Sequence, residues 1–161
     1  MPTNTDSLRD EDRMRLANHR ILRDLGEDLR DHLIGKFRVA DLATGVHILE
    51  EGQSNVRLFV VLKGAVSVRL PKDARRVSEV KLATLGSGEV FGEYSLFDAQ
   101  PVSAAVYAAE PTRLAWLDKA DLDAFLDGHR DVARRFYEGV IRILVARLRA
   151  KNAELDLVTI G

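Results

Sequence analysis

The sequence predicts an α+β fold in which helices occupy both ends of the chain and strands fill the middle. Apolar residues recur at helical spacing before Gly35 and again after Asp118. Between these points the spacing changes to the two-residue alternation of strands, as in Val66, Val68 and Leu70. Glycines separate the strand-like runs at the short intervals typical of a β-sandwich or barrel. Segregated helices around a block of strands indicate an α+β domain.

The bulk composition is that of one folded domain. The chain has 161 residues, of which 46% are hydrophobic and 30% charged, and its net charge is −1. Such a charge gives no global field that would attract DNA or an anionic membrane. The absence of cysteine excludes disulfides and thiolate sites. Because neither a membrane-length apolar run nor an apolar signal core is present, we expect a cytoplasmic protein without a membrane partner. The small net charge also indicates no DNA partner.

At the N-terminus, residues 1–12 are polar, and we expect a disordered tail. Residues 13–36 are predicted to form a small helical bundle of two short helices, interrupted by Gly26 and ended by Gly35. Its apolar positions are Ile21, Leu22, Leu25, Leu29, Leu33 and Ile34.

Residues 37–118 are predicted to form the sheet region. Gly64 lies between two strand-like runs and predicts a tight turn, because glycine tolerates positive φ. The apolar runs are FRVADLA, GVHILEE, RLFVVLKG, AVSVRLP, SEVKLATL, EVFG, AAVYAA and TRLAWLD.

Residues 119–161 are predicted to form two helices. Asp118 is expected to cap a helix that ends at Gly128, and Asp131 a second helix that reaches about Leu155. The second helix would span roughly 37 Å, which is more than is needed to cover one sheet. Alternating four- and three-residue steps indicate a short coiled-coil seam, although a helix packed on its own sheet remains an alternative. The seam positions are Tyr137, Ile141, Leu144, Leu148 and Leu155, interrupted by Lys151.

The segment LGSGEVFGEYSLFDAQPVSAAV, residues 85–106, is a candidate ligand site. Its glycines would permit close backbone approach, and GEYSL predicts a helical turn whose free N–H groups favour an anion. Glu93 could accept hydrogen bonds from sugar hydroxyls. The alternative is an ordinary glycine-rich turn. Between Lys81 and Arg113 the sequence contains no lysine or arginine, which is unusual for an anion site.

This segment resembles the phosphate-binding cassette of cyclic nucleotide-binding domains, as in the catabolite activator protein and the regulatory subunit of protein kinase A. The segments ATGVHILEEGQ, LFVVLKGAVSVRL and DKADLDAFLDGHRDVARRF also resemble that family, so the similarity runs from Leu16 to Leu155. The resemblance implies an eight-stranded antiparallel β-roll flanked by N-terminal helices and by C-terminal hinge helices. It also implies a signalling function and, since related bacterial proteins pair through the last helix, a homodimer.

The resemblance further implies roles for individual residues. Gly92 would supply a backbone contact, Glu93 would accept the ribose 2′-hydroxyl, and Ser103 and Ala104 would present N–H groups to the phosphate. The family places an arginine directly before these small residues, and this sequence has Val102 there. The expected ligand-binding set is Gly92, Glu93, Tyr94, Ser95, Val102, Ser103 and Ala104.

Val102 decides the functional expectation. Removing one partner of a buried charge pair costs about 3–5 kcal/mol, which is on the order of a hundred- to several-thousand-fold in affinity. We therefore expect a non-catalytic regulatory module with weak or absent cyclic AMP and cyclic GMP binding, no cofactor, and an unidentified protein partner. The alternative is a genuine sensor of a cyclic nucleotide or cyclic dinucleotide that takes a cation from outside the cassette. The candidate cations are Arg57, Arg69, Arg147 and Arg149.

Other chemistry finds little support in the sequence. The four histidines, at positions 19, 32, 47 and 129, lack the spacing of a metal site. Ser95 has no apparent base, and Glu89 with Glu93 is better explained as a turn residue and a ribose acceptor than as an acid/base pair. We expect no catalytic or metal site. After the last helix only LDLVTIG remains, which is too short for a DNA-reading domain.

Overall fold

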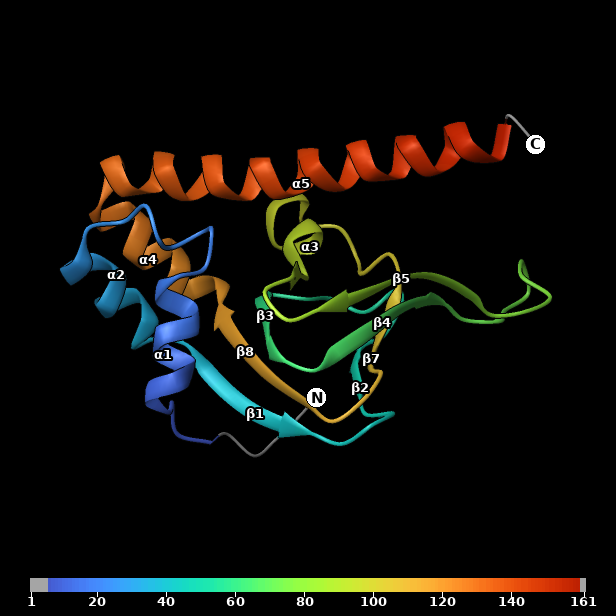
Figure 1. Ribbon diagram of the computed structural model, residues 1–161, viewed down its shortest axis with the longest axis horizontal. Helices are drawn as coiled ribbons and strands as arrows, with labels where there is room; N and C mark the ends of the chain where they lie inside the picture. The colour runs from blue at the N-terminus through green and yellow to red at the C-terminus, as the bar shows by residue number, and fades with distance from the viewer. Residues whose placement is uncertain (1–5, 160–161) are drawn as a thin grey trace.

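The computed structural model describes the backbone of residues 6–159 and the side chains of residues 6–155. Helices lie at both ends of the chain and eight strands lie between them (Figure 1). The helices are α1 (Asp10–Ala17), α2 (Glu27–Ile34), α3 (Glu93–Asp98), α4 (Lys119–Gly128) and α5 (Arg130–Thr159). The strands are β1 (Arg38–Leu42), β2 (His47–Leu49), β3 (Arg57–Lys63), β4 (Ala65–Leu70), β5 (Val80–Gly86), β6 (Val90–Phe91), β7 (Ala105–Ala108) and β8 (Thr112–Asp118).

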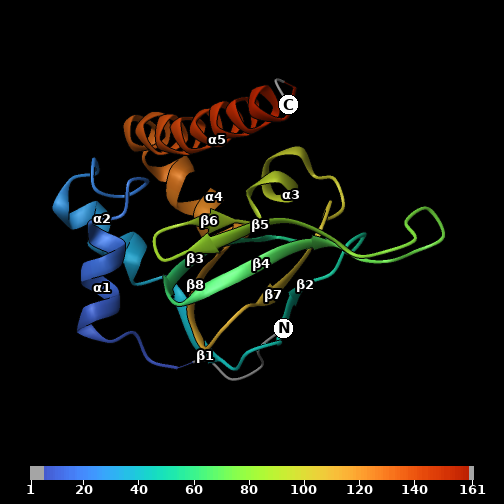
Figure 2. The same ribbon diagram turned by 45° about the vertical axis from the view of Figure 1, so that its right-hand side comes forward.

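The strands form two four-stranded sheets, ordered β1-β8-β3-β6 and β2-β7-β4-β5. Every pairing between these strands is antiparallel. The sheets face each other and make a roll, with α1, α2, α4 and α5 gathered outside it (Figure 2). This arrangement confirms the predicted α+β class and the eight-stranded antiparallel β-roll. Each of the eight apolar runs coincides with one strand, and β5 extends one residue beyond its run, to Gly86.

Gly64 joins β3 to β4, as predicted, but the two strands do not form a paired hairpin. β3 pairs with β6 and β8, whereas β4 pairs with β5 and β7, so the turn is a corner between the sheets. Gly64 has φ +82°, and a Cβ there would lie 2.5 Å from the carbonyl oxygen of Pro111. The corner therefore requires glycine both for its backbone conformation and for its close packing.

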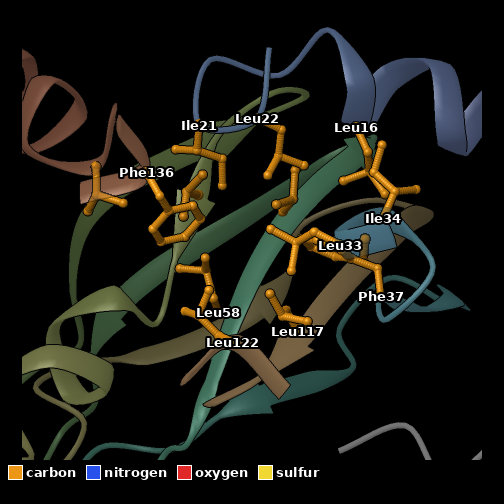
Figure 3. Close-up of a cluster of buried hydrophobic side chains, with 14 of the residues drawn as sticks. Leu16, Ile21, Leu22, Leu33, Ile34, Phe37, Leu58, Leu117, Leu122 and Phe136 are labelled. Carbon is orange, nitrogen blue, oxygen red and sulfur yellow. The ribbon is translucent and has the colours of Figure 1, made fainter. Parts of the chain in front are cut away.

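Two apolar clusters account for the alternation of the strands. The inner cluster fills the roll, where the rings of Phe59 and Phe91 stack with centroids 4.8 Å apart. The outer cluster lies between the first sheet and the helices, and Phe136 of α5 joins it (Figure 3). Because the first sheet is covered on both faces, β3 and β8 are buried at almost every position. The outer residues drawn in Figure 3 include Leu16, Ile21, Leu22, Leu33, Ile34, Phe37, Leu58, Leu117 and Leu122.

The N-terminal segment differs from the expectation of a disordered tail. Helix α1 begins at Asp10, and the backbone N–H of Asp6 donates to the carbonyl oxygen of Val39 on β1. Residues 1–5 lie outside the described part of the chain. The connector between α1 and α2, residues 18–26, is built of turns rather than the predicted helix. It nonetheless buries Ile21, Leu22 and Leu25, which explains their apolar spacing.

A buried ion cluster holds this segment to the roll. Arg113 on β8 is 4% exposed, and its Nε and Nη2 donate to the two oxygens of Asp12 at 2.8 and 2.7 Å. Its Nη1 donates to Asp41 at 2.9 Å and to Asp6 at 3.3 Å. Burial works against ionisation of Asp12, but its hydrogen bonds with Arg113 and Arg9 outweigh this and lower the pKa of Asp12. No local pattern in the sequence predicts that these groups meet.

The C-terminal helices begin differently from the expected caps. Asp118 occupies the N-cap position of α4, but its carboxylate accepts a 2.7 Å hydrogen bond from Nε of Arg57 and does not cap the helix. Asp131 lies within the first turn of α5. α5 has 30 residues, about 45 Å at 1.5 Å per residue. It runs past α3 along one side of the roll (Figures 1 and 2).

Candidate functional site

The candidate cassette runs from β5 through β6 and α3 to β7. Gly92 sits just before α3 with φ +81°, and a Cβ there would lie 2.7 Å from the carbonyl oxygen of Arg57. The amide of Asn55 fixes this corner, because its Nδ2 donates to the carbonyl oxygens of Gly92 at 3.0 Å and Arg57 at 2.8 Å. The sharp turn places Glu93 at the start of α3, and only glycine fits the position before it.

Glu93 is 3% exposed. Burial raises the pKa of its carboxyl, and the nearby guanidinium of Arg147 acts in the opposite direction. Nη1 of Arg147 donates to Oε1 of Glu93 at 2.5 Å. The carboxylate expected to accept a ribose hydroxyl is therefore engaged by the protein itself.

Arg147 also bonds to the turn before the cassette helix. Its Nη2 donates to Oε2 of Glu89 at 3.1 Å and to the carbonyl oxygen of Val90. Its Nε is buried and has no hydrogen-bond partner among the described residues. Arg147 comes from α5, 54 residues after Glu93. The sequence identified it only as one of four candidate cations, since no local pattern marks which arginine of α5 turns inward.

The other candidate cations are engaged elsewhere or point to solvent. Arg57 forms an ion pair with Asp118. Arg69 donates to Glu79 at 2.7 Å and lies over the ring of Tyr107, and Arg149 is exposed. Arg147 is thus the member of this set that reaches Glu93.

Val102, at the position where the family has arginine, is 7% exposed and belongs to the inner apolar cluster. Its N–H donates to the carbonyl oxygen of Gln53 at 2.9 Å, and its own carbonyl oxygen accepts from the N–H of Gly52 at 2.8 Å. The backbone of Val102 is therefore committed to the turn after β2. Its side chain contributes packing, and it offers no charge to a phosphate.

The remaining cassette residues differ in accessibility. Ser103 and Tyr94 are exposed, whereas Ser95 and Ala104 are buried. A cavity of about 500 Å³ reaches Val102, and its lining also contains Tyr107 and Arg75 but not Glu93. Arg75 lies 3.2 Å from Asp73 and 3.6 Å from Glu51, so its charge is already balanced.

Two further findings concern sites of other kinds. Within residues 6–155, no group of three or more histidine or acidic side chains is arranged to hold a metal ion. None of the helices in the described part of the chain is long and apolar enough to cross a membrane.

Comparison with known sequences identifies the family of this chain. The sequence model of the cyclic nucleotide-binding domain family matches residues 40–129, which is more than half of the chain. The chain belongs to the cyclic nucleotide-binding domain family. This membership confirms the resemblance stated from the cassette and the segments around it.

The curated relatives of this chain include proteins of different kinds. It is 31% identical over 144 residues to glutaminase 1 of Bradyrhizobium diazoefficiens, covering 89% of this chain and 22% of that protein. It is 36% identical over 115 residues to the cyclic AMP receptor protein of Thermus thermophilus, covering 71% of this chain and 50% of the relative. The chain thus spans between about a fifth and a half of the curated relatives it matches.

Solved structures share the β-roll. A cyclic nucleotide-binding domain from Methylobacillus flagellatus aligns with a TM-score of 0.82 at 21% identity, covering 92% of this chain and 85% of that one. The regulatory subunit of a cAMP-independent protein kinase A from Trypanosoma brucei aligns with a TM-score of 0.64 at 22% identity, covering 78% and 45%. At these identities the likeness concerns the fold.

Proposed function

We propose that this chain is a non-catalytic regulatory module whose cassette is closed by its own Arg147, so that it binds ordinary cyclic AMP and cyclic GMP weakly or not at all. It works in the cytoplasm and passes its signal through protein–protein contacts. This role needs no cofactor.

The observation that carries the proposal is the charge arrangement of the cassette. The sugar side holds the buried Glu93, whose carboxylate already pairs with Arg147 at 2.5 Å. The phosphate side holds the buried Val102 in an apolar cluster. A cyclic nucleotide would have to displace Arg147 from Glu93, and its phosphate would be desolvated against Val102 without a compensating charge. Loss of one such pair costs about 3–5 kcal/mol.

The fold is compatible with independence from cyclic AMP. The Trypanosoma brucei regulatory subunit with this fold is described as cAMP-independent. A triple mutant of that subunit, in which one substitution replaces a threonine by arginine, is described as bound to cAMP. Val102→Arg would likewise replace a neutral residue by arginine.

A regulatory role also fits the enzyme relative. The match to glutaminase 1 covers 22% of that protein, which leaves most of it outside the shared domain. Among the described residues, no hydrogen bond joins Ser95 to a histidine or a carboxylate, and Arg147 donates to both Glu89 and Glu93. We therefore assign no catalytic residue to this chain.

The outer face of α5 supports a homodimer. Ile141, Leu148 and Leu155 are spaced by seven residues and are 57%, 63% and 65% exposed. Tyr137 lies on the same stripe, and its ring contacts Phe97 of α3, which is also exposed. A seven-residue apolar repeat on an exposed helix favours pairing with a second copy of the same helix. Of the expected seam residues, Leu144 instead packs against the outer cluster of its own roll, and Val145 is exposed beside the stripe.

A second candidate function rests on Arg147. Because Arg147 is a cation from outside the cassette and its buried Nε has no partner in the described structure, it could turn to a phosphate. The chain would then be a genuine sensor of a cyclic nucleotide or cyclic dinucleotide, in which ligand competes with Glu93 for Arg147. The receptor from Thermus thermophilus, a cyclic AMP receptor by name, favours this reading.

Calorimetric titration of cyclic AMP and cyclic GMP separates the two functions. For a closed cassette, the Val102→Arg variant should gain binding, and the Val102→Leu variant, which keeps an apolar side chain, should not. The double variant Val102→Arg, Arg147→Gln should bind more tightly still, because Glu93 is then free to accept the ribose hydroxyl. Binding by the wild type that is lost in both Arg147→Gln and Glu93→Ala would instead establish the sensor.

A further inference from the structure

The ion pair that closes the cassette is part of a longer chain of charges. Glu89, on the turn between β5 and β6, accepts from Arg147 through Oε2 at 3.1 Å and from Nη2 of Arg20 through Oε1 at 3.1 Å. The order Arg20, Glu89, Arg147, Glu93 alternates in sign. The four residues come from the α1–α2 connector, the β5–β6 turn, α5 and α3, so one network joins four elements.

The connector that carries Arg20 is attached to the same two neighbours by independent contacts. Nε2 of His19 bonds to the carbonyl oxygen of Gly88 at 2.9 Å, next to Glu89. Gly139 of α5 packs so closely on the connector that a Cβ there would lie 3.2 Å from the carbonyl oxygen of Arg20 and 3.2 Å from Cα of Ile21. Displacement of the connector would therefore be felt both by the turn that carries Glu89 and by α5, which carries Arg147.

Glu89 is the residue of this network that contacts both arginines. With Arg20 and Arg147 both present, its carboxylate is shared between two guanidinium groups, one on each oxygen. Removal of Arg20 leaves Glu89 facing Arg147 alone, which favours a position of Arg147 nearer to Glu89 and farther from Glu93. The side chains of Arg20 and Glu89 are 39% and 33% exposed, so a substitution of Arg20 disturbs no core packing.

We propose that Arg20 and Glu89 are positioning residues for Arg147, and that the α1–α2 connector thereby controls how firmly the cassette helix α3 is held closed. The inference rests on the proposed function in one respect, namely that Arg147 closes the cassette. It adds an input from the α1–α2 connector to the contact that Arg147 of α5 makes with the cassette. A protein that binds the connector would change the cassette without touching it.

Amide hydrogen exchange of the ligand-free protein tests the coupling. Arg20→Gln should accelerate exchange in α3 about two- to fivefold, the factor expected when a half-exposed ion pair worth about 0.5–1 kcal/mol is lost. Arg23→Gln is the matched control, since Arg23 lies on the same connector and, within residues 6–155, its guanidinium forms an ion pair with Asp24 alone, at 3.8 Å. It should leave α3 unchanged, and Arg20→Lys, which keeps the charge, should stay near the wild-type rate.

The double variant decides whether the effect passes through Arg147. In an Arg147→Gln background, Arg20→Gln should add nothing to the exchange of α3, because the route is already broken. Additive acceleration, or an α3 rate unaffected by Arg20→Gln, would overturn the proposal. No cyclic nucleotide enters this experiment. A wild type that binds cyclic AMP tightly would therefore refute the proposed function and leave this result standing.

Discussion

Glu93 and Arg147 are 54 residues apart in the sequence, yet Nη1 of Arg147 lies 2.5 Å from Oε1 of Glu93. The contact joins the first residue of the cassette helix α3 to the middle of α5. It supplies the opposite charge for a buried carboxylate. It also engages the carboxylate that the family resemblance assigns to the ribose hydroxyl. Under the proposed function, the stability of the domain and the accessibility of its cassette are linked through one ion pair.

Arg147→Gln should lower the free energy of unfolding by about 1–3 kcal/mol, because Glu93 keeps its buried charge without its partner. Urea denaturation measures the change. Arg149→Gln, an exposed neighbour on α5, should stay within about 0.5 kcal/mol of wild type. Glu93→Gln added to Arg147→Gln should restore part of the loss, since the orphaned charge is then gone. Equal stability of Arg147→Gln and wild type would show that the pair contributes nothing.

Arg113→Gln should be more damaging, at about 3–5 kcal/mol, because Asp12 is only 1% exposed and would be left buried and unpaired. Arg9→Gln, which removes a half-exposed partner of Asp41, should cost about 0–1 kcal/mol. The lowered pKa of Asp12 adds a pH signature. Its stabilisation is present above the ordinary value of 3.8 and is lost as the pH falls through the lowered pKa. A wild-type acid-unfolding curve that coincides with that of Arg113→Gln would contradict this account.

His19 should make the domain less stable in mild acid. Burial is the main cause that lowers the pKa of His19, with the neighbouring charge of Arg20 acting in the same direction and Glu89 in the opposite one. The group therefore stabilises the fold fully above 6.5, its ordinary pKa. As the pH falls below that value, stability should drop by up to about 1.4 kcal/mol per pH unit until the lowered pKa is reached.

Urea denaturation at several pH values, compared between wild type and His19→Gln, isolates this contribution. The other three histidines are present in both proteins, so the difference between the two curves reports His19. Glutamine retains a donor for the carbonyl oxygen of Gly88. Identical slopes below pH 6.5 would mean that His19 does not titrate with folding.

Ile141→Asp should produce a monomer if α5 pairs with a second copy, because a charge would replace an apolar residue at the centre of the exposed stripe. Light scattering coupled to size-exclusion chromatography gives the mass. Ala146→Asp places the same charge on an exposed part of α5 away from the stripe and should leave the mass unchanged. A monomeric wild type would refute the dimer directly.

Local patterns predicted the fold well. Short apolar runs separated by turn residues located all eight strands, and glycine marked the corner at Gly64. The cassette and its neutral Val102 were also visible in sequence, because both depend on residues that are close together in the chain. The segment of residues 6–12 was misjudged, since its order depends on Arg113, about a hundred residues away.

Long-range electrostatics explain the rest of what the sequence could not show. Nothing near Arg147 distinguishes it from Arg149, and only the rotation of α5 against the roll decides which one faces Glu93. The same rotation turns Leu144 into its own core and leaves Val145 exposed. Charged residues of this kind can be placed only when the packing of the helices is known.

The most direct test of the closed cassette is a calorimetric titration of the wild-type protein with cyclic AMP and cyclic GMP up to millimolar concentration, accompanied by a thermal-shift measurement. The account predicts no heat of binding and no shift. A dissociation constant below about 10 μM, equivalent to a binding free energy of some 6.8 kcal/mol, would contradict it. Such a value would show that the ligand displaces Arg147 from Glu93.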